Sequence, residues 1–265
     1  MRRFRRSDRG LSEIVGTLML VVIVVTAATL LAAFVATYQK QLQTEQTFTH
    51  DQNLESLKVL GLETALNHAG TAYRNINFTL ASEYINPSIV LGISVNNFPL
   101  VSLWWEDLST HVWTHNAVGT NLTLGPQQEI FVSTNTSSAN NSFLVPPPPP
   151  SQYLKFDVYT VLQNDFSRVF LPPTAFGVVS EINPSGSNPI TLLDGSQSFQ
   201  PGGNASLVQW NWTVSGGGLL IPESFSGEEV EVSPALTVGQ TYSILLVVSN
   251  SDGLLGSATL SYTAP

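Results

Sequence analysis

Few side chains in this sequence have the types and spacing that catalysis or metal binding requires. His111 and His115 are four residues apart, but their segment favours a strand or loop, and the glutamate that accompanies paired histidines in a helical zinc motif is missing. Ordinary surface or core histidines are therefore the favoured interpretation. Asp194 and Asp252 are isolated, which is more typical of turns than of calcium sites. We expect no metal site.

Motifs for an enzyme active site or a bound cofactor are also missing from the sequence. It has no Gly-x-Ser-x-Gly nucleophile motif, no phosphate-binding glycine loop and no dinucleotide-binding fingerprint. It has no cysteine, which excludes disulfides, thiolate metal ligands and cysteine nucleophiles. The sequence therefore predicts a protein that is not an enzyme and that carries no cofactor.

Asparagine sequons are the most frequent chemical motif. An Asn-x-Ser/Thr triplet accepts a glycan in an exported protein. The candidate acceptors are Asn77, Asn121, Asn135, Asn140, Asn204 and Asn211. Several such triplets arise by chance in a chain rich in Ser, Thr and Asn, so the sequence does not single out the modified ones. We expect some of them to carry sugars, which would hydrate a surface with few charges.

Trp104, Trp105 and Trp113 form the other cluster with a recognisable chemistry. Exposed indole rings would provide a surface on which sugar rings stack. Packing of these rings inside a β domain is the favoured interpretation.

The distribution of charge excludes one class of partner. Charged residues make up 11% of the chain, and the formal net charge is −9. Five of the ten basic residues lie in the first ten positions beside one acid, which leaves five basic and eighteen acidic residues. This remainder repels phosphate backbones, so we expect no nucleic-acid partner.

An uncharged apolar stretch at residues 14–39 is the candidate for a membrane-spanning helix. About 20 helical residues cross the ~30 Å hydrocarbon core of a bilayer. Because the short flank before this stretch is rich in arginine, we expect that flank to stay inside and the rest of the chain to be exported. A plain single-pass anchor that is never cut is one interpretation of this segment.

The junction before the apolar stretch supports a second interpretation. The run Arg9-Gly10-Leu11-Ser12-Glu13-Ile14-Val15-Gly16-Thr17 resembles the N-terminus of archaeal type IV pilins, which carry a class III signal peptide. The resemblance implies that a prepilin peptidase cuts between Gly10 and Leu11 and removes a leader at residues 1–10. It also implies that the helix, expected at residues 11–50, stays on the mature subunit.

Glu13 has two possible roles. By the same resemblance, an acid near the mature N-terminus helps to align an incoming subunit with the free amine of a neighbour. Here the acid is the third mature residue, whereas the bacterial pattern has it at the fifth. The alternative is that Glu13, together with Ser12, caps the start of the helix, where acids are favourable.

The composition of the helix suits close packing with other helices. Small side chains allow close approach, and threonine hydroxyls can form hydrogen bonds in an apolar bundle. The small residues are Gly16, Ala27, Ala28, Ala32, Ala33 and Ala36, and the threonines are Thr17, Thr26, Thr29 and Thr37. We expect a membrane helix that becomes a filament core.

Residues 51–173 are expected to form an antiparallel β domain, because short alternating segments are separated by Asn, Gly and Pro clusters. Residues 154–170 predict a closing hairpin, as in pilin heads. The prolines at 146–150 predict a stiff polyproline segment, and the polar residues 133–142 predict a flexible loop.

Residues 174–265 are expected to form a second β-sandwich. Alternation places Val208, Trp210, Trp212 and Val214 on one face of a strand, and residues 242–248 alternate likewise. The segments at residues 193–198, 208–212 and 242–254 resemble those of PKD domains, which are immunoglobulin-like β-sandwiches. The Trp-Asp-Phe-Gly-Asp-Gly signature of that family is replaced here by Trp210-Asn211-Trp212-Thr213-Val214-Ser215.

Together these features predict a long hydrophobic helix followed by mainly β structure, namely a pilin-like head and a PKD-like domain. The expected function is that of an extracellular pilus subunit that contacts or adheres to surfaces. Its expected partners are copies of itself, other pilins, the prepilin peptidase, the membrane assembly machinery and an unidentified surface or glycan ligand. The precursor would lie in the membrane and the mature subunit in a surface filament. The alternative is an unpolymerised, membrane-anchored adhesin or envelope protein.

Overall fold

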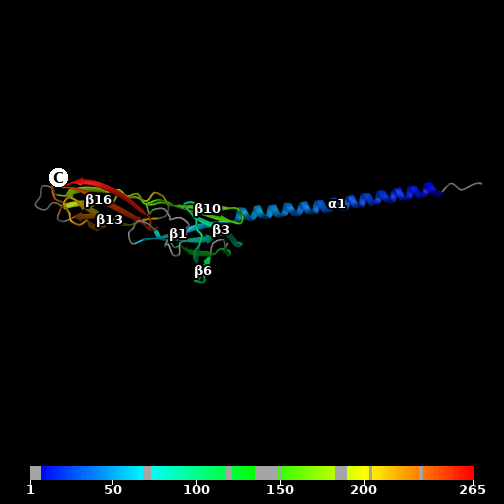
Figure 1. The fold of residues 1–265 in the computed structure, drawn as a ribbon, viewed down its shortest axis with the longest axis horizontal. Coiled ribbons are helices and arrows are strands. Elements are labelled where there is room, and N and C mark those ends of the chain that lie inside the picture. The colour runs from blue at the N-terminus through cyan, green and yellow to red at the C-terminus, as the bar shows by residue number, and fades with distance from the viewer. Residues whose placement is uncertain are drawn as a thin grey trace, which may run out of the picture. The chain divides into compact units, whose positions relative to one another are not determined.

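A computed structural model of the chain describes residues 7–67, 73–116, 121–134, 149, 151–182, 190–202, 205–232 and 235–265, with side chains from residue 13 onward. The chain divides into two compact units, Met1–Leu54 and Glu55–Pro265. The first contains one helix and the second contains all of the β-strands in the described part of the chain. A long apolar helix is thus followed by mainly β structure (Figure 1).

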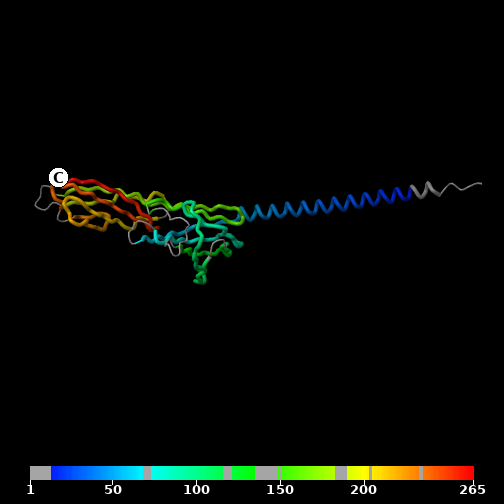
Figure 2. The backbone as a smooth tube through the Cα atoms, in the orientation of Figure 1, coloured from blue at the N-terminus to red at the C-terminus, as the bar shows by residue number. Residues whose placement is uncertain are grey.

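The helix α1 runs from Ser7 to Leu54 without interruption. Figure 2 shows its coloured part as one continuous helical trace. The helix extends a few residues beyond the expected range of 11–50 at both ends. The reason at the C-terminal end is composition, because residues 39–54 are mostly good helix formers and contain neither proline nor glycine. Among the described residues, this is the one helix long and apolar enough to cross a membrane, as judged by length and composition.

The first β-sandwich consists of two antiparallel sheets. Sheet 1 has the strand order β1-β2-β8-β5-β6, and sheet 2 has the order β10-β9-β3-β4, with β7 paired to β3. The strands of sheet 1 are β1 Leu57–Leu66, β2 Tyr73–Ser82, β8 Glu129–Ser133, β5 Leu103–Asp107 and β6 Val112–Asn116. Those of sheet 2 are β10 Asp165–Phe170, β9 Leu154–Thr160, β3 Ser88–Val95, β4 Phe98–Pro99 and β7 Leu122–Leu124.

Alternation along these strands builds the first core. Ile76, Phe78 and Leu80 of β2 point inward and are fully buried, as are Phe156 and Val158 of β9. The rings of Phe78 and Phe156 meet across the two sheets at a centroid distance of 4.8 Å. The hairpin expected at residues 154–170 is present, since β9 and β10 pair antiparallel.

Glu55 fixes the start of the second unit to this sandwich. The residue is buried, and its Oε2 accepts hydrogen bonds from Thr160 Oγ1 at 2.6 Å and Asn164 Nδ2 at 3.0 Å. These two partners flank the turn between β9 and β10. The first residue after α1 is therefore held by side-chain hydrogen bonds as well as by the chain.

The second β-sandwich also pairs two antiparallel sheets. Sheet 3 has the order β11-β12-β15, and sheet 4 has the order β14-β13-β16-β17. The strands are β11 Val178–Ile182, β12 Ile190–Asp194, β15 Glu229–Val232, β14 Glu223–Ser226, β13 Leu207–Gly216, β16 Thr241–Asn250 and β17 Leu255–Thr263. Trp212 is fully buried in this core, and its Nε1 donates to the Gly227 carbonyl at 3.0 Å. A side chain at Gly195 would collide with the Trp210 ring, so the close approach there requires glycine.

One strand of the second sandwich departs from the expected alternation. Val208 was expected to point inward with Trp210 and Trp212, but it is 56% exposed. A register shift between Leu207 and Gln209 leaves Val208 without a partner on β16, and Leu207 packs against the core in its place. The expectation for Val208 was wrong because a bulge moved its side chain to the outer face.

The turn between β16 and β17 joins the two sandwiches. Leu254 is fully buried and belongs to the core of the first sandwich, although its neighbours in the chain belong to the second. Asn250 is also buried, and its Nδ2 donates to the Leu171 carbonyl at 3.2 Å and to Gln200 Oε1 at 3.0 Å. Thr64 Oγ1 donates to the Asp252 carbonyl at 3.3 Å. The second sandwich therefore completes the core of the first.

Candidate functional site

The surface of α1 is the first candidate site. Its apolar side chains between residues 14 and 35 are exposed on all sides of the helix, and Leu30 and Phe34 are examples. Burying one such side chain is worth about 1.5–3 kcal/mol, so this surface requires a cover of lipid or of other apolar helices. This arrangement can hold a protein in a membrane or in a bundle.

The threonines of α1 satisfy their own hydroxyls. Thr26 Oγ1 donates to the Val22 carbonyl at 2.8 Å, and Thr17 Oγ1 donates to the carbonyls of Glu13 and Ile14 at 3.0 and 2.9 Å. Thr29 and Thr37 bond to their own helix in the same way. Because these hydroxyls already have acceptors, α1 can lie in lipid without hydrogen bonds from a second helix.

The residues expected at the cleavage site lie near the start of α1. The Gly10–Leu11 bond and Glu13 are all within the helical range, and Glu13 is exposed. No described residue forms an ion pair with Glu13. Cleavage after Gly10 and the role of Glu13 in assembly remain predictions.

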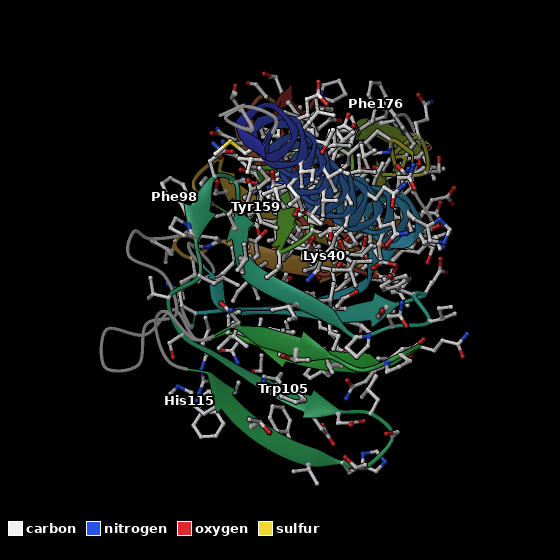
Figure 3. The ribbon with its side chains drawn as sticks, turned by 90° about the vertical axis from the view of Figure 1, so that its right-hand side faces the viewer. Lys40, Phe98, Trp105, His115, Tyr159 and Phe176 are labelled. Atoms are coloured by element: carbon white, nitrogen blue, oxygen red, sulfur yellow. The ribbon has the colours of Figure 1, made fainter. Side chains whose placement is uncertain are left out.

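The outer face of sheet 1 is the second candidate site. Cross-strand register aligns Trp104 of β5 with His115 of β6 on one side and Ser133 of β8 on the other. In the next row, Glu106 of β5 lies between Trp113 of β6 and Phe131 of β8. The term aromatic face denotes Trp104, Trp113, His115 and Phe131. Figure 3 labels His115 on β6 and Trp105 on the neighbouring strand β5.

The rings of the aromatic face form two pairs and remain accessible. Trp104 and His115 are 4.6 Å apart with an interplanar angle of 33°, and Trp113 meets Phe131 edge-on at 6.4 Å. Trp104 is 50% exposed and Trp113 is 48% exposed. The expectation that the tryptophans pack inside was therefore wrong for Trp104 and Trp113. Adjacent residues of a strand point to opposite faces, so Trp105 packs against the core while Trp104 points outward.

Polar groups border the aromatic face. His111 Nδ1 lies 2.9 Å from Glu106 Oε1, and His115 Nε2 lies 2.9 Å from Ser102 Oγ. The two histidines thus take different partners and do not converge on one point, as a metal site requires. The described residues contain no group of three His, Asp, Glu or Cys side chains arranged to hold a metal.

An open groove of about 640 Å³ lies between the β5–β6 turn and the turn before β8. Asp107 lines it, but its carboxylate is fully engaged. Hydrogen bonds from the Ser109 hydroxyl and backbone N–H, and from Gln128, hold the pKa of Asp107 below its usual value. These hydrogen bonds make the carboxylate part of the turn.

The other isolated acids lie in turns. Asp194 accepts a hydrogen bond from the Ser196 backbone N–H at 2.8 Å, and bonds from the Ser196 hydroxyl and N–H lower its pKa. Asp252 lies in the turn that joins the sandwiches, where burial raises its pKa. The hydrogen bonds to the Asp194 carboxylate give this acid a structural role in its turn.

The sequons differ in their surroundings. Asn121 is exposed directly before β7, and Asn211 is exposed in the middle of β13. Asn77 is half-buried in β2, where its Oδ1 accepts from Ser133 Oγ at 3.1 Å and from the Thr134 N–H at 3.3 Å. Asn135, Asn140 and Asn204 lie outside the described residues, as do most of the 146–150 prolines.

The sequence offered Trp104 and Trp113 as an exposed surface only as the less favoured interpretation, and it gave no sign of Phe131, because register and not local pattern assembles the aromatic face. Phe131 lies far along the chain from Trp113 and carries no motif of its own. The adjacent pair Trp104-Trp105 was the one available signal, because two neighbouring residues of a strand do not both point inward.

Comparisons with known proteins add distant likenesses. No protein-family model matches the chain, and no curated protein matches it. The crystal structure of the chicken CNTN1 FN1–FN3 domains aligns with a TM-score of 0.28 and 9% identity over 78% of this chain and 66% of that chain. The crystal structure of Parabacteroides merdae β-glucuronidase aligns with a TM-score of 0.26 and 10% identity over 73% of this chain and 29% of that chain. At these scores neither likeness carries information about function.

Proposed function

We propose that this chain is a structural subunit of a type IV-like pilus. In this proposal the prepilin peptidase cuts after Gly10, and α1 leaves the membrane to pack with α1 of sister subunits and other pilins. The membrane assembly machinery carries out that transfer. The β-sandwiches are displayed outside the cell for surface contact.

The observation that carries this proposal is the length of α1 together with the apolar surface of its residues 14–35. A helix that needed only to anchor the chain would end near the bilayer surface, after about 20 residues. Helix α1 instead continues for 48 residues in all. Its small residues, among them Gly16, Ala28 and Ala32, permit close helix contacts. Exchange of lipid for equally apolar helices costs little free energy, which suits a subunit that moves from membrane to filament.

The residues around the expected cut support the same proposal. The sequence from Arg9 to Thr17 places a basic residue and a glycine directly before the apolar run, as in class III signal peptides. Glu13 is then the third residue of the mature chain. A lone carboxylate beside an apolar run is costly unless it finds a cation, and the new amino terminus of a neighbouring subunit would supply one.

The two sandwiches would provide the displayed surface. The first would be the pilin head, and the second, with Trp212 buried on β13 and the β16–β17 hairpin, would be the PKD-like domain. The negative net charge disfavours nucleic acid as the ligand of this displayed surface, which leaves surfaces and glycans. The alternative function is an uncut, membrane-anchored adhesin that uses the same two sandwiches as a monomer.

The N-terminus of the mature protein and the presence of filaments test the proposal. We expect purified surface material to begin at Leu11 and to form filaments by electron microscopy, and we expect these filaments to disappear when the gene is deleted. Single molecules that still contain residues 1–10 would refute the pilin proposal and favour the anchored adhesin.

Substitution at the cut provides the matched test. Gly10→Val should block cleavage and leave the leader attached. Gly16→Ala is the control, because a methyl group there meets open space in the isolated helix. The control should still begin at Leu11. Equal cleavage of both variants would contradict the assigned site.

A further inference from the structure

The sequon at Asn77 lies on the same face of sheet 1 as the aromatic face. Asn77 aligns with Glu63 on β1 and bonds to Ser133 on β8, and Ser133 aligns with Trp104. One row therefore runs from Glu63 through Asn77, Ser133 and Trp104 to His115. Adjacent strands are about 4.8 Å apart, so Trp104 is roughly 10 Å from Asn77 across the sheet.

The second residue that defines the sequon lies in the neighbouring row. Thr79 aligns with Phe131, which aligns with Glu106, which aligns with Trp113. Phe78, between the two sequon residues, is fully buried in the core. The acceptor asparagine thus lies in one of the two rows that contain the exposed rings, and its threonine lies in the other.

Hydrogen bonds orient the Asn77 amide. Its Oδ1 accepts from two donors on the β8 side, Ser133 Oγ and the Thr134 N–H. Its Nδ2 has no hydrogen-bond partner among the described residues. An Asn-linked glycan is attached through Nδ2, and the attached amide keeps Oδ1 as an acceptor. The two donors therefore hold the amide in an orientation that a linked sugar can retain.

The aromatic face has the chemistry of a sugar-binding surface. Trp104 and Trp113 are each about half exposed, and indole rings stack on the apolar faces of pyranose rings. Glu106 and Ser133 lie between the rings and can bond to sugar hydroxyls. The two rows contain Glu63 and Glu106 but no lysine or arginine, which favours neutral sugars over acidic ones.

We infer that a neutral glycan linked to Asn77 lies across the aromatic face of its own chain. In the modification step, Nδ2 of Asn77 loses one proton and bonds to C1 of the sugar. The bond from C1 to the phosphate oxygen of a lipid-phosphate-linked oligosaccharide breaks, and the lipid phosphate leaves with the electron pair. The first sugars then cover Ser133 and Phe131, and the following ones reach Trp104 and Trp113.

Asn211 provides a matched control within the chain. Its sequon also has a fully buried aromatic residue, Trp212, between an asparagine and a threonine on the outer face of a strand. Its cross-strand neighbours are Ser226 and Val247, and no aromatic ring lies beside it in that register. A glycan on Asn211 has no ring to stack on there.

The test uses the full chain from its native host, solubilised in detergent as single molecules so that contacts between copies do not contribute. Thr79→Ala removes the sequon and keeps Asn77 with its hydrogen bonds, while Thr79→Ser keeps the sequon. Thr213→Ala and Thr213→Ser form the control pair. Peptide mass spectrometry reports glycan at each asparagine, and hydroxyl-radical footprinting reports the accessibility of each tryptophan.

We expect a glycan mass on Asn77 in the wild type and in Thr79→Ser, and several-fold faster oxidation of Trp104 and Trp113 in Thr79→Ala. The Thr213 pair should leave both rates unchanged. Unmodified Asn77 in the wild type would overturn the inference, as would equal oxidation rates with and without the Asn77 glycan. The mature N-terminus of the same material shows separately whether the pilus proposal holds.

Discussion

Asn77 and Asn211 begin sequons of the same kind in two different sheets. Each is followed by a fully buried aromatic residue, Phe78 or Trp212, and then by a threonine on the outer face. Beside the Asn77 sequon, β8 contributes Ser133 and Phe131, and the rows continue to Trp104 on β5 and Trp113 on β6. Beside the Asn211 sequon the neighbouring strands contribute serine, valine and leucine. The same three-residue pattern therefore faces two chemically different surfaces, because the cross-strand partners decide what surrounds it.

The two sequons also differ in how the asparagine is held. Two donors from β8 bond to Asn77 Oδ1, whereas Asn211 Oδ1 accepts one bond from Gln209 of its own strand at 3.2 Å. The outer face of sheet 4 continues with exposed Ser257, Thr259 and Ser261 of β17, a row of hydroxyls without charge. The hydroxyls of that row hydrate the face, whereas the aromatic face presents exposed rings.

The largest effects on stability are expected from substitution of Phe78 and Trp212, the buried middle residues of the two sequons. Phe78→Ala and Trp212→Ala should each lower the free energy of unfolding by about 3–5 kcal/mol, since both leave cavities in well-packed cores. Trp212→Ala also leaves the Gly227 carbonyl without its donor. Chemical denaturation of the full chain in detergent measures the loss. A loss below about 1 kcal/mol at either position would contradict the assigned core.

Leu254→Ala tests whether the two regions are coupled. The residue belongs to the second sandwich in sequence but is buried in the core of the first, so we expect a loss of about 2–5 kcal/mol. Hydrogen exchange should accelerate in β1 and β10, which belong to the first sandwich. Exchange that changes in β16 and β17 alone would show that the sandwiches are independent. Val238→Ala, an exposed residue, serves as the control.

Trp104→Ala and Trp113→Ala should change stability much less than Trp212→Ala. Both rings are about half exposed, so we expect a loss of roughly 1 kcal/mol or less in the chain without glycan. The same denaturation measurement applies. If either variant is as unstable as Trp212→Ala, the ring is part of the core and the aromatic face is not an accessible surface.

The smallest effect is a pH dependence shared by the two sandwiches. Hydrogen bonds from Ser109 lower the pKa of Asp107, and those from Ser196 lower the pKa of Asp194. A carboxyl with a lowered folded pKa adds stability above its unfolded pKa and loses it as the pH falls through the folded pKa. Denaturation midpoints should therefore fall as the pH drops below about 4, the pKa of an aspartate in the unfolded chain. Asp107→Asn and Asp194→Asn should each flatten part of that decline, whereas an unchanged profile in both would rule out these turns as its source.

Local patterns predicted several elements because each depends on neighbours in sequence. The helix follows from an uninterrupted run of helix formers, and the inward faces of β2 and β16 follow from alternation at Phe78 and Ile244. The β9–β10 hairpin follows from two strands joined by a short polar turn. Val208 broke the alternation because a bulge depends on the register with β16, which the strand itself does not encode.

The sequence by itself determined a membrane-length apolar helix, a chain with few charges, and sequons in which an asparagine and a threonine share one face. These properties are local, since each follows from side-chain chemistry and the period of a helix or strand. The tertiary structure alone decided that Phe131 lies beside Trp113, that Leu254 enters the other core, and that Asn77 rather than Asn211 adjoins exposed rings. These contacts join residues far apart in the chain, and only the pairing of strands brings such residues together.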